Sequence, residues 1–252
     1  MPAGTTLIPI RTRPLLPPRD DLWEALTPAL PVLQEGDVVA ITSKIVAIAQ
    51  GRCIPVEAVL DKEQLVEAEA DAWISRASSK YGITLAIKGG TLVASAGIDA
   101  SNAKEHYVLW PKAPWAAARE IGERLTASSG VARLGVILTD SHCIPLRRGT
   151  VGISIGSYGF EPLRDYRGSP DIFGRPLEVT VSNLADAMAA AAVGLMGEGA
   201  ECLPVVVLRN WPGLVFSDAD HREDLIIPPE EDIFAPLLKA FGAPALASMR
   251  GE

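Results

Sequence analysis

The sequence predicts an α+β fold with mixed and antiparallel sheets. Segments typical of strands and of helices follow one another without the regular strand–helix–strand alternation of a doubly wound parallel sheet. The chain has 252 residues, of which 48% are hydrophobic, so it can bury a sizeable core. Turn residues separate the segments, among them the proline-rich run at 13–21 and the Gly89-Gly90 pair.

The first part of the chain predicts a strand, a capped helix and a buried strand. Residues 7–10 form a short apolar run. After a proline-rich turn, the acid pair at 20–21 supplies a helix cap, and Trp23 and Leu26 have the i, i+3 spacing of an amphipathic face. Residues 36–52 begin with a turn, continue as a buried strand and lead into a second apolar segment.

The middle of the chain predicts two helices and a hairpin. Residues 61–82 are acidic at the start and basic near the end, which suits the helix dipole. Residues 84–98 read as two strands around the Gly89-Gly90 turn. Residues 113–130 form an alanine-rich helix that ends at a Ser-Ser-Gly sequence.

The remaining elements alternate between apolar strands and helices. Residues 133–141 are a buried strand with a polar end, and residues 149–159 are predicted to be a glycine-rich pair of strands. Residues 177–201 run from a strand into an alanine-rich helix. Residues 202–211 form another buried strand, and a short helix near 233–241 follows.

Charge and cysteine content exclude several classes of protein. The net charge is −8 and no block of Lys and Arg occurs, which argues against nucleic-acid or anionic-membrane partners. No apolar run is long enough to span a bilayer, and the N-terminus lacks a signal-peptide pattern. The three cysteines fit neither a disulfide framework nor a zinc site, so we expect a cytoplasmic location.

Three acids occur where a metal site is plausible. Asp99 and Asp140 each follow an apolar strand, and carboxylates at such positions suit Mg²⁺ or Mn²⁺. The alternative is capping of the strand ends. Glu198 follows a glycine at the C-terminal end of a helix, where the dipole disfavours an acid. Its alternative is an exposed loop position.

Two basic stretches suit anionic ligands. Arg147 and Arg148 precede a glycine-rich run whose backbone amides and guanidinium groups can bind phosphate. Glycines that permit close strand packing are the simpler explanation. Residues 164–176 concentrate Arg, Asp, Gly and Pro, which fits either acidic-substrate binding or a structured loop with mutually paired charges. The adjacent His142 and Cys143 carry no protease signature.

Taken together, these stretches resemble the coenzyme F420-0:L-glutamate ligases, also called F420 gamma-glutamyl ligases. The shared segments occur in order over nearly the whole chain. They are "GDVVAITSKIVA", "AGIDASN", "GVILTDS" followed by "PLR", "IGSYGFEPLRDYRG", "DIFGRPLEVT", "ADAMAAAA" and "LMGEG".

The resemblance implies an architecture and an activity. It implies a two-lobed α+β ligase unit that forms an intertwined homodimer, with residues 1–84 plus 202–252 as the nucleotide-contacting lobe and residues 85–201 as the lobe carrying the metal and phosphate motifs. The family adds L-glutamate through γ-linkages to the deazaflavin precursor coenzyme F420-0, using GTP. The resemblance also implies two divalent cations, Mg²⁺ or Mn²⁺, with K⁺ as a further candidate.

The resemblance also implies site residues. The positions that match metal ligands are Asp99, Asp140, Ser141 and Glu198. The positions that match nucleotide contacts are Arg13, Pro14, Leu15, Leu16, Ser43, Lys44, Asn102, Met196, Gly197 and Gly199. The candidate catalytic residues are Asp99, Asp140 and Arg147.

Two departures from the family pattern occur, of which Ile48 affects a phosphate or base contact and His142-Cys143-Ile144 affects the acceptor. Ile48 and Gln50 stand where the family usually has Lys and Glu, and 142–144 replace the usual Phe-Gly-Arg region. We therefore expect a retained metal and nucleotide core and a changed acceptor pocket, for a pterin or furan cofactor for example. ATP is the alternative nucleotide. The alternative function is a nucleotide-binding relative without ligase activity.

Overall fold

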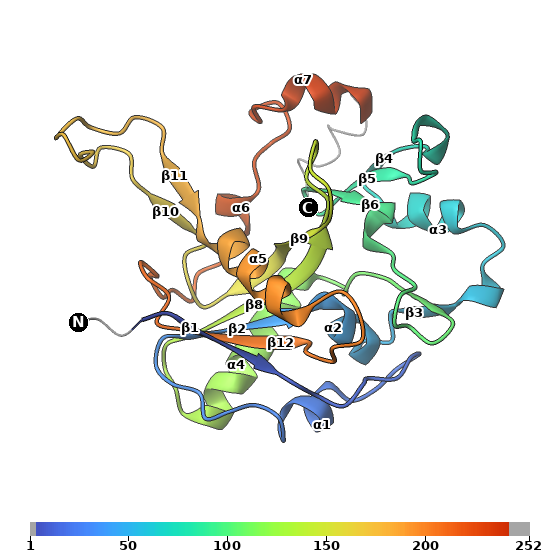
Figure 1. Ribbon diagram of the computed structural model, residues 1–252, viewed down its shortest axis with the longest axis horizontal. Coiled ribbons are helices and arrows are strands. Elements are labelled where there is room, and N and C mark those ends of the chain that lie inside the picture. The colour runs from blue at the N-terminus through green and yellow to red at the C-terminus, as the bar shows by residue number, and fades with distance from the viewer. Residues whose placement is uncertain (1–3, 242–252) are drawn as a thin grey trace.

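A computed structural model describes residues 4–241. Its centre is a mixed five-stranded sheet with helices on both faces (Figure 1). The strand order is β1 (Thr6–Ile10), β12 (Val205–Arg209), β2 (Asp37–Thr42), β8 (Leu134–His142) and β9 (Val151–Tyr158). β2 and β8 are parallel, and the other neighbours are antiparallel. This confirms the predicted α+β class with mixed and antiparallel sheets.

Alternating side chains of the sheet fill two separate cores. Val39 and Ile41 of β2 pack into the core that includes helix α4 (Pro114–Ser129). Val38 and Ala40 point to the opposite face and pack into the core of helix α5 (Leu184–Met196). A strand with both faces covered reads as a continuous apolar run, which is the pattern in the sequence.

Two short helices, α1 (Leu22–Leu26) and α2 (Ser43–Ala49), pack into the same core as α4. The Asp21 carboxylate accepts hydrogen bonds from the amides of Trp23 and Glu24, and so caps α1. Helix α2 begins where β2 ends. It is the second apolar segment expected within residues 36–52.

Smaller elements surround the central sheet. β4 (Ala72–Ile74), β5 (Leu85–Lys88) and β6 (Thr91–Ala94) form one sheet, and β3 (Cys53–Pro55) pairs with β7 (His106–Val108). Helix α3 (Lys62–Glu69) and the single turn η3 (Ser95–Gly97) pack together. β10 (Leu163–Asp165) and β11 (Val181–Asn183) form an arm that projects from the body (Figure 1). The remaining short elements are η1 (Val56–Ala58), η2 (Arg76–Ser78), α6 (Arg222–Leu225), α7 (Ala235–Leu238) and η4 (Lys239–Phe241).

The predicted helix over residues 61–82 is wrong in its second half. The helix α3 ends at Glu69, and β4 follows it. Trp73 and Ile74 are residues that favour strands, and β4 pairs with β5 in antiparallel register. The charge gradient that suggested one helix therefore spans a helix, a strand and a turn.

The predicted pair of strands over residues 149–159 is a single strand, β9. Its glycines are not turn residues. A Cβ on Gly152 would lie 2.3 Å from the carbonyl oxygen of Ala189 in α5. A Cβ on Gly156 would lie 2.8 Å from the backbone of Pro114 in α4. Glycine here lets both helices approach the strand, which confirms the close-packing explanation.

The predicted two lobes, homodimer and cytoplasmic location stay predictions. The central sheet takes β1, β2 and β12 from one predicted lobe and β8 and β9 from the other. Residues 242–252 of the first predicted lobe lie outside the described residues. Within residues 4–241, every helix falls short of the length and hydropathy needed to cross a bilayer.

Candidate functional site

A cavity of about 750 Å³ lies at the carboxyl ends of β2 and β8. Thr42 and Thr139 are the last register partners where these strands run parallel, and both line the cavity. Ser43 and Lys44 follow one strand end, and Asp140 follows Thr139 on the other. Parallel pairing thus brings segments almost 100 positions apart to one edge of the sheet.

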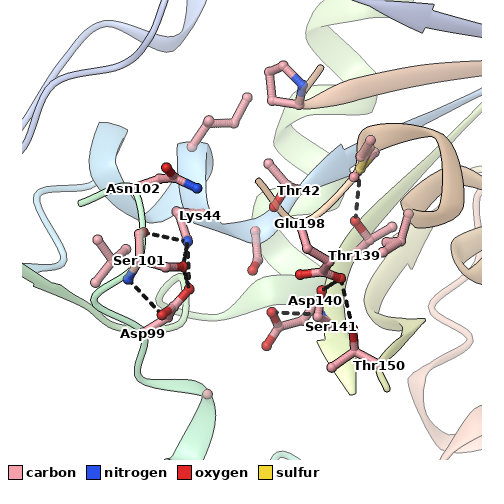
Figure 2. Close-up of a pocket in the computed structure, with 18 of the residues that line it drawn as sticks. Thr42, Lys44, Asp99, Ser101, Asn102, Thr139, Asp140, Ser141, Thr150 and Glu198 are labelled. Atoms are coloured by element: carbon pink, nitrogen blue, oxygen red, sulfur yellow. Dashed lines mark hydrogen bonds and ion pairs between the residues drawn. The ribbon is translucent and has the colours of Figure 1, made fainter. Parts of the chain in front are cut away.

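One wall of the cavity carries an ion pair between Lys44 and Asp99 (Figure 2). Lys44 Nζ lies 2.6 Å from Asp99 Oδ2 and donates to the carbonyl oxygen of Ser101 at 2.8 Å. The Ser101 amide donates to Asp99 Oδ1 at 2.8 Å, and its hydroxyl donates to Oδ2. Burial raises the pKa of Asp99, but the hydrogen bonds from Lys44 and Ser101 outweigh it, so the pKa lies below its ordinary value.

Pairing with Val108 and a tight preceding turn fix the backbone of Asp99. It pairs with Val108 through two hydrogen bonds, Asp99 N to Val108 O at 3.1 Å and Val108 N to Asp99 O at 2.8 Å. The preceding turn η3 has three residues with positive φ, ending at Gly97 with φ +72°. The strand-end acid is therefore held in a defined position rather than on a free loop.

The facing wall carries Asp140 and Ser141 on consecutive positions of β8 (Figure 2). Alternation along the strand sends their side chains to opposite sides. Asp140 Oδ2 accepts from the indole Nε1 of Trp110, and Oδ1 accepts from the Ser141 amide at 2.9 Å. Burial raises the pKa of Asp140 to about 6 against these hydrogen bonds, and the nearby Asp99 charge adds to the rise.

Glu198 joins this wall from the loop after α5. Its Oε1 accepts from Ser141 Oγ at 2.6 Å and from Thr150 Oγ1 at 3.1 Å (Figure 2). Gly197 has φ +75°, and a Cβ there would lie 2.4 Å from the Glu201 carboxyl carbon. Glycine at 197 therefore permits the turn that aims Glu198 at β8.

Asn102 links the two walls. Its Nδ2 donates to the carbonyl oxygen of Gly199 at 2.8 Å. The Gly199 amide in turn donates to the Glu201 carboxylate at 2.8 Å. This chain connects the Asp99 turn with the Glu198 loop across the cavity.

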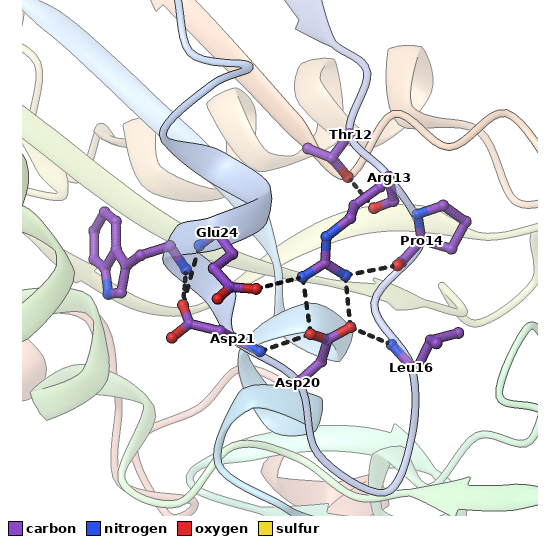
Figure 3. Close-up of polar contacts among 8 residues, drawn as sticks. Thr12, Arg13, Pro14, Leu16, Asp20, Asp21 and Glu24 are labelled. Atoms are coloured by element: carbon purple, nitrogen blue, oxygen red, sulfur yellow. Dashed lines mark hydrogen bonds and ion pairs between the residues drawn. The ribbon is translucent and has the colours of Figure 1, made fainter.

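The segment from Arg13 to Asp20 closes on itself beside the cavity (Figure 3). The Arg13 guanidinium donates to both Asp20 oxygens at 2.7 and 2.9 Å and lies 3.5 Å from Glu24 Oε2. Asp20 also accepts from the amides of Leu16 and Asp21, each at 2.8 Å. The pKa of Asp20 consequently lies well below its usual range, because of Arg13 first. Arg13 therefore shapes this loop.

Most predicted site residues meet in this one cavity. Those that line it are Arg13, Pro14, Leu15, Ser43, Lys44, Asp99, Asn102, Asp140, Ser141, Met196, Gly197, Glu198 and Gly199. Leu16 is 51% exposed and lies outside the lining, as does the exposed Arg147. Of the departures noted in the sequence, Ile48 and Cys143 line the cavity, whereas Gln50 holds the backbone of Lys112.

Sequence reasoning missed three residues. Trp110 and Thr150 hydrogen-bond to predicted metal ligands, and Lys62 lines the cavity. Lys62 Nζ lies 5.5 Å from the centre of the Tyr107 ring, and no carboxylate in the described part of the chain forms an ion pair with it. Lys62 is an unremarkable surface-type residue in the sequence, so no local signal identifies it.

The acids suit hard divalent cations, although they do not form one compact ligand cluster. Among residues 4–241, no three His, Cys, Asp or Glu side chains lie close enough together to hold one ion. Asp140 has only neutral donors, and its raised pKa shows that burial disfavours its charge. A nearby cation would offset that cost. Each ion would take one or two of these acids and complete its shell with water and substrate oxygens, as Mg²⁺ commonly does.

Comparison with known proteins identifies the family of this chain. The profile of the family described as F420-0:Gamma-glutamyl ligase matches residues 10–210. Proteins named coenzyme F420:L-glutamate ligase are similar over most of the chain. The one from Methanopyrus kandleri is 35% identical over 86% of this chain and 92% of its own length. The one from Archaeoglobus fulgidus is 33% identical over 92% and 97%. The one from Methanothermobacter thermautotrophicus is 32% identical over 92% and 99%.

The matched region contains both strands that end at the cavity and every acid that lines it. The chain therefore belongs to the F420-0:gamma-glutamyl ligase family.

Proposed function

We propose that this protein is a nucleotide- and divalent-metal-dependent γ-glutamyl ligase that joins L-glutamate to a carboxylate acceptor, coenzyme F420-0 or a related cofactor. The observation that carries the proposal is the meeting of Asp99, Asp140 and Glu198 around one cavity in a chain similar to enzymes named coenzyme F420:L-glutamate ligase. The proposed nucleotide is GTP, with ATP as the competing candidate.

Amide formation needs an activated carboxylate, and an acyl phosphate supplies it. An oxygen of the acceptor carboxylate attacks the γ-phosphorus of the nucleotide, and the bond to the β–γ bridging oxygen breaks. The nucleoside diphosphate leaves. The amine of glutamate then attacks the acyl carbon, loses a proton, and inorganic phosphate departs. Positioning and charge stabilisation account for most of the catalysis of phosphoryl transfer.

The acids and Ser141 would hold the cations, which when bound spread the charge of the transferred phosphoryl group. The donor set supports this role, since it consists of carboxylates and a hydroxyl. Lys44 keeps Asp99 ionised and fixed by direct contact at 2.6 Å. Thr150 and Ser141 orient Glu198 through their hydroxyl groups.

Lys62 supports binding of an anionic part of a substrate. The other cationic side chains in the cavity lining, Arg13 and Lys44, already form ion pairs with Asp20 and Asp99. Lys62 instead lies over the Tyr107 ring. Carboxylates of glutamate or phosphates of the nucleotide and acceptor are the anions that this reaction offers.

Two departures from the family pattern lie in the cavity lining. Ile48 is 2% exposed and places an apolar side chain where a lysine would contact phosphate or base. Cys143 follows Ser141 by two positions and also lines the cavity. Cys143 therefore supports a changed acceptor pocket, and neither departure removes a carboxylate.

We also propose that the protein is a homodimer that uses the arm of β10 and β11. Ile172 and Phe173 in its loop are 91% and 88% exposed, and Val179 is 84% exposed. Exposed apolar groups gathered in this way are typical of interaction surfaces. Light scattering should give a dimer mass, and replacing Ile172 and Phe173 by Asp should give a monomer. A monomeric wild type would contradict this.

A ligase assay tests the proposed activity. Purified protein is incubated with GTP or ATP, Mn²⁺, L-glutamate and coenzyme F420-0, and mass spectrometry measures addition of a glutamyl residue. Nucleoside diphosphate release should require both glutamate and acceptor, and Asp140→Asn should abolish it. Product with a pterin or furan carboxylate but not F420-0 would identify a related acceptor. Nucleotide and metal binding without release in any combination would favour the non-catalytic alternative.

A further inference from the structure

The indole of Trp110 touches both segments that carry the cavity's aspartates. Its side chain is 3% exposed, and Nε1 donates to Asp140 Oδ2. The five-membered part of the indole also packs against Gly97, two residues before Asp99. A Cβ at Gly97 would lie 2.0 Å from Trp110 Nε1. Only a glycine leaves room for the indole in this position.

A charged network outside the cavity holds the ring in place. Lys88 Nζ lies 5.8 Å from the centre of the Trp110 ring, a cation–π arrangement. Lys88 and Arg52 both form ion pairs with Glu69. Arg52 Nε also donates to the carbonyl oxygen of Trp110 at 3.2 Å. Trp110 is thus held at its backbone carbonyl, at the face of its indole ring and at its indole N–H.

We propose that Trp110 is a positioning residue for the metal site, and this rests on the proposed function. Its N–H fixes the rotation of the Asp140 carboxylate and occupies a lone pair of Oδ2, so the remaining lone pairs of the carboxylate are available to a cation. Its ring supports the turn that leads to Asp99. One rigid side chain therefore sets the relation between acids on facing walls of the cavity. Hydrogen-bond partners of metal ligands typically change metal affinity by about 10–100-fold when removed.

The test compares Mn²⁺ binding by the full-length wild type and Trp110→Phe, without substrates, using electron paramagnetic resonance to count free Mn²⁺. Phenylalanine keeps an aromatic ring and lacks the N–H. We expect Kd to rise about 10–100-fold. Trp211→Phe is the matched control, because Trp211 packs against the core on the opposite face of the sheet. It should bind Mn²⁺ like the wild type.

A double-mutant cycle separates positioning from a general structural effect. If Trp110 acts through Asp140, Trp110→Phe should change Mn²⁺ affinity little in an Asp140→Asn background. An equal loss in both backgrounds would overturn the inference, and so would wild-type affinity in Trp110→Phe alone. Failure of the wild type itself to bind Mn²⁺ would instead overturn the proposed metal site, and this inference with it.

A second measurement needs no substitution of Trp110. In ¹⁵N-labelled wild-type protein the assigned indole N–H resonance of Trp110 should shift on addition of Mg²⁺, while that of Trp211 should not. The Trp110 resonance should also move in metal-free Asp140→Asn. A Trp110 resonance that responds to neither change would show that the N–H is not coupled to the site.

Discussion

Replacing Asp140 by Asn should make the metal-free protein gain stability relative to the wild type as the pH rises from 4 to 8. Burial raises the pKa of this carboxyl from 3.8 to about 6. In the unfolded chain it titrates near its ordinary value, so the folded state binds the proton more tightly. Stability from this group is therefore complete below about pH 4 and is lost as the pH rises through about 6. The difference amounts to about 3 kcal/mol at pH 8.

Asparagine removes the charge, but only its carbonyl oxygen can accept a hydrogen bond. Its NH2 group therefore faces the N–H of Trp110 or of Ser141, and the donor left without a partner costs about 1–3 kcal/mol at every pH. At pH 4 in EDTA, Asp140→Asn should therefore melt below the wild type. Between pH 4 and pH 8 the difference in stability should shift by about 3 kcal/mol in favour of the variant. Since about 1 kcal/mol moves Tm by about 2–4 °C in a protein of this size, the Tm difference should shift by several degrees. At pH 8, Mn²⁺ at 100 times its Kd should stabilise the wild type by about 2.7 kcal/mol and should stabilise the variant less, because the variant lacks a proposed metal ligand.

Differential scanning calorimetry from pH 4 to pH 8 measures both effects. Glu198→Gln is the control, because Glu198 is exposed and its loss should alter metal-free stability by no more than about 0.5 kcal/mol. It should nevertheless weaken stabilisation by Mn²⁺. If the Tm difference between metal-free Asp140→Asn and the wild type stays constant from pH 4 to pH 8, the buried charge carries no such cost and the reasoning is refuted.

Three further predictions concern other parts of the chain. Arg209→Met should destabilise the fold by about 3–5 kcal/mol in urea denaturation, because it leaves the fully buried Asp37 carboxylate without the guanidinium that contacts both its oxygens; an unchanged midpoint would contradict this. Lys62→Ala should raise KM for one anionic substrate about tenfold or more while the Mn²⁺ Kd stays unchanged, and unaltered KM values would remove Lys62 from the site. Asp20→Asn should speed hydrogen exchange at the Leu16 amide, because this amide donates to the Asp20 carboxylate, and it should change Tm little. Unchanged exchange would mean that the loop closes without the ion pair.

Local patterns predicted the central elements well. The buried strands, the Gly89-Gly90 hairpin and the helices α4 and α5 have strong apolar periodicity or clear end signals, and each lies where it was expected. The errors fall where tertiary packing overrides local preference. The segment at 72–74 becomes a strand because β5 pairs with it. The glycines of β9 resemble turn residues in the sequence, but they serve the approach of two helices.

The site was predicted in its parts and not in its arrangement. Strand-end position suggested Asp99 and Asp140, and the family resemblance supplied Ser141 and Lys44. The sequence gives no sign that Trp110 supports Asp140, because an indole in an apolar run is typical of a core. The role of Arg13 also depends on the fold, since its pairing with Asp20 follows from how the loop closes.

The position of Asp140 and Ser141 within β8 has a consequence for redesign of the cavity. Backbone pairing with β9 fixes the spacing of these two residues. The turn that begins after His142, with Cys143 in the cavity lining and Leu146 fully exposed, lies outside the sheet. Substitutions in that turn can therefore reshape one side of the cavity without moving Asp140 or Ser141.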